Sequence, residues 1–324
     1  MRHRIVFGAI ALVAATAADV QGQCSGPTVT RQACESARDL VTFMTPQLAT
    51  SIAGGSSTLG QSGVLGGLGH FGLSVRATVV TNGAIPDVSD LAFRTDATKA
   101  NYATTKQMIP GVGVDGALGI TKGINVGATR VGGIDVLVSA LYIPEADLGD
   151  FSLKAPDGSL KLGYGGRVGL LEESVAAPGV YVSYLQRDLP TVSLSGTSGV
   201  ATGVGTASGT FALNDFSVKT SALRLVAGKG FGILGLQAGI GRDTYKASAT
   251  VSATVLGQST TGASGFTMTR NNMFAGAMLN FVLFKIVAEA GQVTGGSLPA
   301  LFNNFDKAAD ESRMYLSGGI RISF

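Results

Sequence analysis

Apolar and polar residues alternate with a period of two along most of the chain beyond residue 66. In the stretch FGLSVRATV (71–79), for example, every odd-numbered position is apolar. This period places successive side chains on opposite faces of a β-strand. Segment 211–228 is the least regular, and we predict a β-bulge near Ser221 and Ala222, where its apolar face changes. Ten segments carry the pattern and predict ten strands, with approximate cores at 67–81, 108–121, 131–143, 158–171, 178–194, 211–228, 231–251, 264–283, 285–296 and 312–324.

The connections between these segments alternate in length. Short turns, such as the one near Phe284 and Lys285, alternate with long polar or Ser/Thr/Gly-rich stretches, such as 195–210 and 252–263. Short turns on one side and long loops on the other are typical of an up-and-down sheet whose two ends face different environments. An even number of strands returns such a sheet to the side where it began, and the count of ten satisfies this condition. The last segment is therefore expected to pair with the first, which leaves no free edge.

The first residues indicate export. Two arginines precede a short apolar stretch at 5–18, and small residues follow, so we predict a cleaved secretory signal peptide over 1–22. A lipoprotein anchor at Cys24 is disfavoured because Gln23 stands where lipid-modified proteins need a small residue. Exported cysteines meet an oxidising compartment, so Cys24 and Cys34 either form a disulfide that closes a small loop or remain two free thiols.

The chain between the signal peptide and the sheet has helical character. In 30–44, apolar residues recur at spacings of three and four. Thr45 followed by Pro46 is typical of a helix N-cap with proline at the first helical position, which predicts a second short helix over 46–53. We therefore predict a short helical prefix over 23–65, which is either periplasmic or inserted into the lumen of the sheet.

Composition decides which face of the strands meets which environment. Only 14% of residues are charged, Lys+Arg number 24 against 21 Asp+Glu, and Gly numbers 47. This balance excludes a nucleic-acid binder, which carries a clustered basic excess. A secreted soluble β-sandwich is the main alternative, but its polar faces carry many charges, whereas these carry Gly and Ser with isolated charges. We predict an all-β fold: a transmembrane up-and-down antiparallel β-barrel of about 10 strands over 66–324, with its apolar face toward lipid.

The C-terminal residues carry a resemblance to a known class of proteins. In YLSGGIRISF (315–324), Ile320, Ile322 and Phe324 alternate with polar residues up to the terminal aromatic residue. With the signal peptide and the alternating array, this ending resembles Gram-negative outer-membrane β-barrel proteins of the porin-like superfamily. The resemblance implies an outer-membrane location, contact with outer-membrane lipid, and recognition of these three residues by the barrel-assembly machinery. The helical prefix is also similar to the N-terminal segment of the long-chain fatty-acid transporter family, whose barrels have more strands.

Isolated charged and polar residues on the non-apolar face are candidates for the lumen. Glu289 and Arg321 lie on neighbouring segments, a few residues from the same rim, and we predict that they form an ion pair. Such charges either cross-link a narrow barrel or line a conduction path, and ten strands lie between the filled and the wide sizes. The candidates are His70, Arg76, Asp115, Asp135, Lys161, Arg167, Gln237, Glu289, Arg313 and Arg321.

Catalytic and metal chemistry lacks the residues that it needs. His70 is the only histidine beyond the predicted signal peptide, and Ser74 on the same face does not by itself make a nucleophile–base pair. The two cysteines have no neighbouring His or carboxylate cluster and do not make a metal site. We expect no enzyme, metal or cofactor, and we expect passage or binding of small hydrophobic or amphipathic solutes. The alternatives are a non-conducting structural or surface-interaction barrel and, least favoured, a lipid-modifying barrel enzyme.

Overall fold

The computed structural model describes residues 24–56, 58, 60–87, 99–127, 129–143, 145–148, 151–202 and 205–324. The signal peptide predicted over 1–22 lies outside the described residues. Among the described residues, no helix has the length and apolar character needed to span a membrane.

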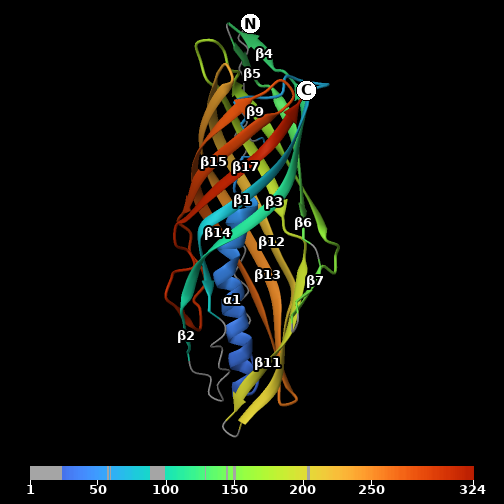
Figure 1. Ribbon diagram of the computed structural model, residues 1–324, viewed down its shortest axis with the longest axis vertical. Coiled ribbons are helices and arrows are strands. Elements are labelled where there is room, and N and C mark those ends of the chain that lie inside the picture. Colours follow the sequence, from blue (N-terminus) through green and yellow to red (C-terminus); the bar gives the residue numbers. More distant parts are fainter. Residues whose placement is uncertain are drawn as a thin grey trace, which may run out of the picture.

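Ten strands of the described chain close into a ring in which every strand is antiparallel to both neighbours. The order around the ring is β10-β9-β6-β3-β1-β17-β15-β14-β13-β12, and β12 pairs with β10 to complete it (Figure 1). Each of the ten predicted segments overlaps one ring strand, so the predicted barrel is confirmed. The ring strands are β1 (Phe71–Pro86), β3 (Thr104–Thr121), β6 (Ile134–Tyr142), β9 (Leu160–Leu171), β10 (Gly179–Asp188), β12 (Gly205–Phe231), β13 (Leu234–Val255), β14 (Gln258–Asn280), β15 (Lys285–Thr294) and β17 (Arg313–Ser323).

Seven further strands lie outside the ring. β11 pairs with the part of β12 that lies beyond β10, and β8 and β7 continue the sheet outward from β11. The other four form two small two-stranded sheets, β4 with β5 and β16 with β2. Their bounds are β2 (Asn101–Tyr102), β4 (Ile124–Val126), β5 (Thr129–Val131), β7 (Ala146–Leu148), β8 (Phe151–Lys154), β11 (Val192–Thr202) and β16 (Asn304–Phe305).

The last strand pairs with the first, as the sequence predicts. β17 and β1 are in register from Gly72 opposite Ser323 to Val80 opposite Tyr315. Beyond β17, the backbones of Phe71 and Phe324 exchange two hydrogen bonds of 3.0 Å. Their rings also lie together, with centroids 5.4 Å apart. This pairing satisfies the backbone groups that would otherwise form a sheet edge.

The two ends of the ring differ in their connections. We call the end with Phe324 the turn end, and the opposite end, where β11 and the tips of β13 and β14 lie, the loop end (top and bottom of Figure 1).

The predicted long loops at 195–210 and 252–263 are wrong, because both stretches are hairpins. β13 and β14 stay paired as far as Val255 and Gln258, with only Leu256 and Gly257 between them, both at positive φ. A two-residue turn of this kind matches the twist of the strands that it joins.

The bulge in β12 lies nearer the loop end than predicted. The register with β13 shifts between Asn214 and Ser217, and Asp215 has a φ of 52°. From Phe216 to Gly228 the alternation keeps one phase, so no bulge forms at Ser221 and Ala222.

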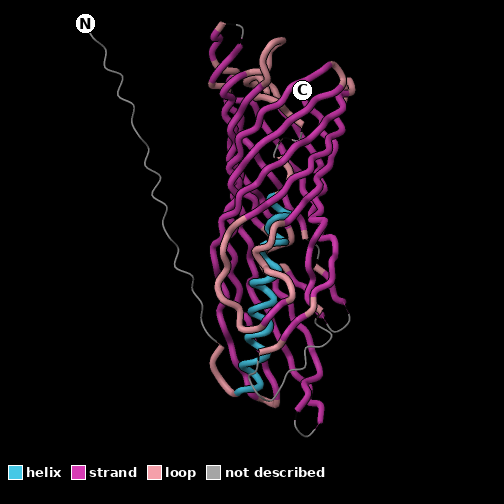
Figure 2. The backbone as a smooth tube through the Cα atoms, turned by 90° about the vertical axis from the view of Figure 1, so that its left-hand side faces the viewer, coloured by secondary structure: helices cyan, strands magenta, loops and turns pink. Residues whose placement is uncertain are grey.

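The described residues contain one helix, α1 (Thr28–Ala53), which the strands enclose (Figures 1 and 2). It contacts β1, β3, β10, β12, β13, β14 and β17. The prediction of two helices divided at Pro46 is wrong, because the proline lies within one continuous helix. The Thr45 hydroxyl does not act as an N-cap; it donates to the Val41 carbonyl oxygen at 2.7 Å, one turn back in the same helix. Packing against the enclosing strands therefore overrides the local preference for a helix boundary at Thr45 and Pro46.

The outward side chains on the turn-end side of the ring are exposed and apolar, and we call them the apolar band. Every ring strand contributes to the band. Apolar side chains outside a closed sheet are stable in lipid, so the architecture is that of a transmembrane β-barrel. One example from each strand is Val75, Val114, Val136, Val168, Tyr184, Leu225, Leu236, Met273, Ile286 and Leu316.

The apolar and polar faces exchange sides partway along β13. From Leu234 to Ile240 the outward residues are apolar, but from Arg242 onward they are Arg, Thr, Lys and Ser. Over the same change, the inward residues pass from Gly and Gln to Tyr, Ala and Val, which are buried. We call the part beyond this change, residues 192–202, 205–221 and 242–270, the extension. Because its polar face is outside and its apolar face inside, it is built like a water-soluble domain.

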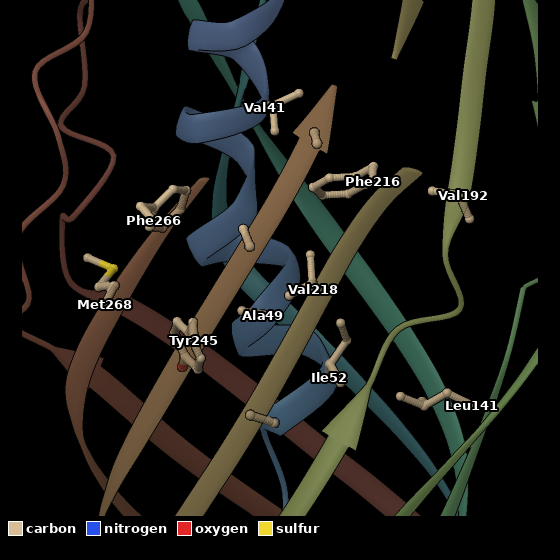
Figure 3. Close-up of a cluster of buried hydrophobic side chains, with 13 residues drawn as sticks. Val41, Ala49, Ile52, Leu141, Val192, Phe216, Val218, Tyr245, Phe266 and Met268 are labelled. Carbon is tan, nitrogen blue, oxygen red and sulfur yellow. The ribbon is translucent and has the colours of Figure 1, made fainter. Parts of the chain in front are cut away.

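The core of the extension packs against α1. Val41, Ala49 and Ile52 of the helix face apolar side chains from β12, β13 and β14 (Figure 3). The helix is thus a structural part of this half of the molecule, because it covers the inner face of an otherwise open sheet. The strand residues of the cluster are Leu141, Val192, Phe216, Val218, Tyr245, Ala247, Ala249, Phe266 and Met268.

Candidate functional site

The C-terminal end of α1 lies within the ring, where three arginines bind its last carbonyl groups. Arg76 Nη1 donates to Gly54 O at 2.6 Å, and Arg224 donates to Ala53 O at 2.6 Å and Gly55 O at 2.8 Å. Arg187 Nη1 donates to Ala53 O at 3.3 Å. We call Arg76, Arg187 and Arg224 the arginine collar. The last carbonyls of a helix lack partners and carry partial negative charge, so cations there stabilise the helix end.

Two buried carboxylates form ion pairs with the arginine collar. Asp115 on β3 accepts from Arg76 Nε at 2.9 Å and from Arg187 Nη2 at 3.1 Å. Asp243 on β13 lies 3.6 Å from Arg224 Nη2. Because these side chains are almost fully buried, removal of one partner would leave the other charge without compensation.

Glu289 binds the chain that follows the helix, and the predicted pair with Arg321 is wrong. Its carboxylate accepts from the Ser56 backbone N–H at 3.2 Å, from Gln237 Nε2 at 3.1 Å and from the Tyr315 hydroxyl at 3.2 Å. Glu289 is opposite Ser317 on β17, whereas Arg321, four residues nearer the turn end, is opposite Lys285. Strand register therefore separates the two charges, and the carboxylate is used to hold a backbone group.

A second set of contacts holds the chain between α1 and β1. Arg167 donates to Thr58 Oγ1 at 2.5 Å and to Asp135 Oδ2 from Nε at 2.9 Å. Asp135 in turn accepts from the Leu65 backbone N–H at 3.1 Å. We call residues 24–65 the plug. The contacts from the end of α1 to Leu65 hold its C-terminal part inside the ring, and its N-terminal part packs against the extension.

The structure buries eight of the ten candidate lumen residues: Arg76, Asp115, Asp135, Arg167, Gln237, Glu289, Arg313 and Arg321. The other two, His70 and Lys161, are exposed and half-buried, respectively. Sequence reasoning missed Arg187 and Arg224 of the arginine collar. The sequence did contain this information, because both arginines occupy positions of the alternation that point inward. On β10, for example, Arg187 has the same orientation as Ser183.

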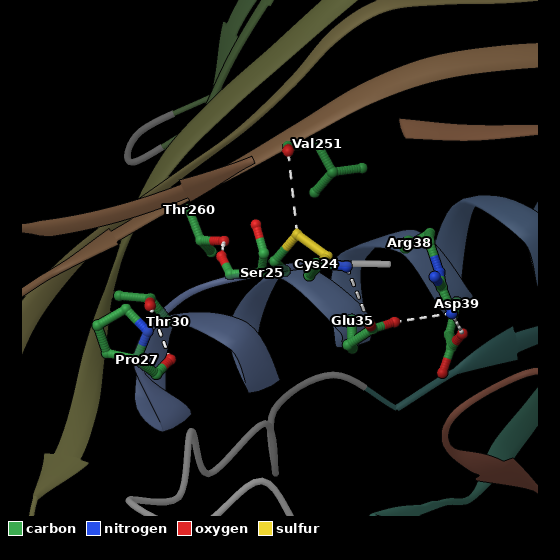
Figure 4. The surroundings of a disulfide bond; sticks show 10 residues. Cys24, Ser25, Pro27, Thr30, Glu35, Arg38, Asp39, Val251 and Thr260 are labelled. Carbon is green, nitrogen blue, oxygen red and sulfur yellow. Dashed lines mark hydrogen bonds and ion pairs between the residues drawn. A yellow bond between two sulfur atoms is a disulfide. The ribbon is translucent and has the colours of Figure 1, made fainter. Parts of the chain in front are cut away.

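The first residues of the plug are anchored at the loop end. Cys24 and Cys34 form a disulfide that packs against Val251, Ala253 and Val255 of β13 (Figure 4). Glu35 accepts from the Cys24 backbone N–H at 3.1 Å and pairs with Arg38 at 2.7 Å. The N-terminal part of the plug is thereby joined to the core of the extension.

Asp39 connects the plug to the connection between β15 and β17. Its carboxylate accepts from the Phe302 N–H at 3.1 Å, the Asn303 N–H at 2.6 Å and Asn303 Nδ2 at 2.9 Å. Burial raises the pKa of this carboxyl, and the hydrogen bonds from Asn303 and Phe302 oppose that rise.

Asp39→Ala should accelerate trypsin cleavage after Lys307 by about tenfold, because it leaves buried backbone N–H groups without an acceptor at roughly 1–3 kcal/mol. Lys307 is exposed in the connection that Asp39 holds. Peptide mass spectrometry of timed digests measures the rate. Asp157→Ala, an exposed carboxylate in another connection, is the control. An unchanged cleavage rate would show that Asp39 does not hold this segment.

An open depression of about 1110 Å³ lies at the turn end. Plug residues 60–65 form part of its lining, together with His70, Lys285 and Arg321. The described residues contain no group of three or more His, Cys, Asp or Glu side chains placed to hold a metal ion. The contacts of the plug are those of a segment fixed in place. Arginines of the strands donate hydrogen bonds to its carbonyl oxygens, and carboxylates of the strands accept hydrogen bonds from its backbone N–H groups.

No protein-family model matches the chain, and no curated protein matches it. Similar solved structures include Ail, the attachment invasion locus protein of Yersinia pestis, at 12% identity over 79% of this chain and 99% of that chain, with a TM-score of 0.27. The toluene transporter TodX of Pseudomonas putida has 8% identity over 83% and 96%, with a TM-score of 0.21. The outer membrane channel DcaP of Acinetobacter baumannii has 11% identity over 79% and 96%, with a TM-score of 0.20. All three are outer-membrane β-barrel proteins, the class that the sequence resembles. At these TM-scores they carry no argument about function, and the fold assignment rests on the closed ring and its apolar band.

Proposed function

We propose that the protein is an outer-membrane β-barrel whose lumen is closed by its own plug and which presents the extension at the cell surface. It is thus the non-conducting surface-interaction barrel, and not an open passage for solutes. One observation carries the proposal: three arginines from three different strands bind the end of α1 inside the ring. In this proposal, the plug closes the water path at the level where these buried ionic contacts hold it.

The turn end faces the periplasm in this proposal, and the loop end faces outward. The signal peptide expected at 1–22 delivers the chain to the periplasm, so the short connections lie there and the extension lies outside. The apolar band contacts outer-membrane lipid, and the barrel-assembly machinery recognises β17 through Ile320, Ile322 and Phe324. All three side chains are exposed on the outward face, where another protein can bind them before the barrel closes.

A gated passage is the second candidate. The open depression at the turn end ends on plug residues 60–65, so small amphipathic solutes can reach the plug from that side. Passage then requires release of the plug. Catalysis is not proposed: His70 is exposed at the rim, and the Ser74 hydroxyl donates to the Asp115 carbonyl oxygen at 3.3 Å.

Planar-bilayer recording of the full-length protein tests the proposal. We expect no conductance from the full chain and steady conductance from a variant that lacks residues 24–65, which also shows that the assay detects an open ring. Steady conductance from the full chain would contradict the closed barrel. Conductance that appears in the full chain only when an amphipathic solute is added from the turn-end side would support the gated passage instead.

A further inference from the structure

Three basic side chains lie on the outward face of the extension, next to the apolar band. Arg242 and Lys246 lie on β13, and Lys219 lies on β12. We call these three residues the basic cluster. All three side chains are exposed, and they belong to neighbouring strands. None of them takes part in the contacts that hold the plug.

The register of the sheet places Lys219 and Lys246 at one level, and Arg242 lies four residues along β13 toward the apolar band. Lys219 is directly opposite Lys246, and Arg242 is opposite Leu223 of the apolar band. Arg242 is also the first outward residue of β13 after Ile240, which is 60% exposed. The basic cluster therefore begins at the point where the apolar outer face ends.

The charges of the basic cluster are not neutralised within the described chain. Like charges directly opposite each other across two strands are unfavourable. No carboxylate of the described residues lies within 4.0 Å of any of the three as an ion-pair partner. The carboxylate closest by register, Asp188 opposite Lys219, is 8% exposed and accepts hydrogen bonds from Gln186. An external anion would remove the repulsion between Lys219 and Lys246.

We propose that the basic cluster binds the phosphate groups of an anionic lipid in the outer leaflet of the membrane. This inference rests on the outer-membrane placement proposed above. Headgroup phosphates lie at the boundary of the hydrocarbon, which is the level at which β12 and β13 change from apolar to basic outward residues. The acyl chains of the same lipid lie along the apolar band, against Leu223 and Ile240.

The neighbouring strand adds uncharged hydrogen-bonding groups. Asn271 is opposite Arg242, and Thr267 is opposite Lys246, both on β14 and both exposed outward. Amide and hydroxyl donors beside cations are suited to the several oxygens of a phosphate group. A site of three cations beside the Asn271 amide, on three adjacent strands, matches a phosphorylated headgroup better than a neutral one.

The test measures binding of bisphosphorylated lipid A to the full-length protein in neutral detergent, by displacement of a fluorescent lipid A. The variant is the triple substitution Lys219→Gln, Arg242→Gln and Lys246→Gln. The matched control, Lys99→Gln with Lys122→Gln and Lys307→Gln, removes the same charge at exposed positions elsewhere. We expect the first variant to bind about a hundredfold more weakly, since each cation near an anionic headgroup contributes about 1 kcal/mol, and the control to stay within about twofold of the original protein. Dephosphorylated lipid A should bind both proteins equally weakly.

Several outcomes would overturn the inference. Equal affinity of the original protein and the basic-cluster variant for lipid A is one, and full displacement of lipid A by inorganic phosphate, which indicates a free-phosphate site, is another. Insertion into vesicles is measured in parallel by the heat-dependent gel shift of folded barrels. Failure of the original protein to insert would refute the membrane placement, whereas normal insertion with unchanged lipid A affinity would refute only the lipid site.

Discussion

Arg224→Ala should destabilise the folded barrel by about 3–5 kcal/mol, the cost of removing one partner of a buried ion pair. The Arg224 side chain is 4% exposed, and it supports the Ala53 and Gly55 carbonyls as well as Asp243. Its loss leaves the charge of Asp243 buried, and the Ala53 and Gly55 carbonyls keep only the longer hydrogen bonds from Arg187, at 3.3 Å and 3.5 Å. The midpoint of urea unfolding in lipid vesicles measures the change, with circular dichroism as the signal because the chain has no Trp.

Two comparisons decide whether the effect comes from the buried charge. Arg224→Met combined with Asp243→Leu should recover most of the lost stability, because a buried pair replaced as a unit by apolar side chains costs little. Arg130→Ala should cost no more than about 1 kcal/mol, because its ion pair with Glu172 is exposed. A double variant as unstable as Arg224→Ala would indicate that the hydrogen bonds to the plug, and not the charge, carry the effect.

Leu236→Arg should impair insertion of the barrel by about 2–4 kcal/mol, whereas Ser248→Arg should leave it unchanged, because only the first places a charge in hydrocarbon. Both residues point outward from the same strand, β13, and both are exposed in the described structure. They differ in their position relative to the change of faces between Ile240 and Arg242. The folded fraction after dilution into vesicles, read from the heat-dependent gel shift, measures the effect.

Equal loss of insertion in both variants would mean that lipid reaches the level of Ser248, and equal tolerance would mean that β13 is not in lipid at Leu236. Ala249→Arg is a further control, because it points inward into the core packed on α1. This variant should be destabilised by loss of that core, although it lies beside the tolerant Ser248. Comparison of the variants at Ser248 and Ala249 therefore separates the effect of side-chain orientation from the effect of position along the strand, and comparison of Leu236 with Ser248 isolates the effect of lipid.

The strands were predictable because their signal is local. In β13, Leu236 and Ile240 have one parity and Gln237 has the other, so the outward and inward faces follow from the period alone. The change of faces in the same strand was also present as the alternation of Ser and Thr with Ala and Val in residues 247–255. It was missed because the new pattern has the same period and differs only in phase.

The position of the helix was not predictable in the same way. A helix on one surface shows an apolar stripe, whereas α1 is buried on nearly all sides and has Thr and Ser on several faces. Its hydroxyl groups bond to carbonyls of the helix itself, as Thr42 does to Arg38 O at 3.0 Å and Thr50 to Pro46 O at 2.8 Å. Such a sequence is compatible with a periplasmic segment or with an enclosed one, and only the packing of the strands around it decides between them.

The sequence by itself determined the number of ring strands, their outward faces along the apolar band and the pairing of the last strand with the first. Each of these depends on a period of two within a segment, and closure follows once the two ends of the sheet lie on one side. Only the tertiary structure decided that Arg76, Arg187 and Arg224 meet at one helix end, and that Glu289 binds Ser56 instead of Arg321. Those contacts join residues far apart in the chain, and they exist only because closure of ten strands brings the inward side chains around a common space.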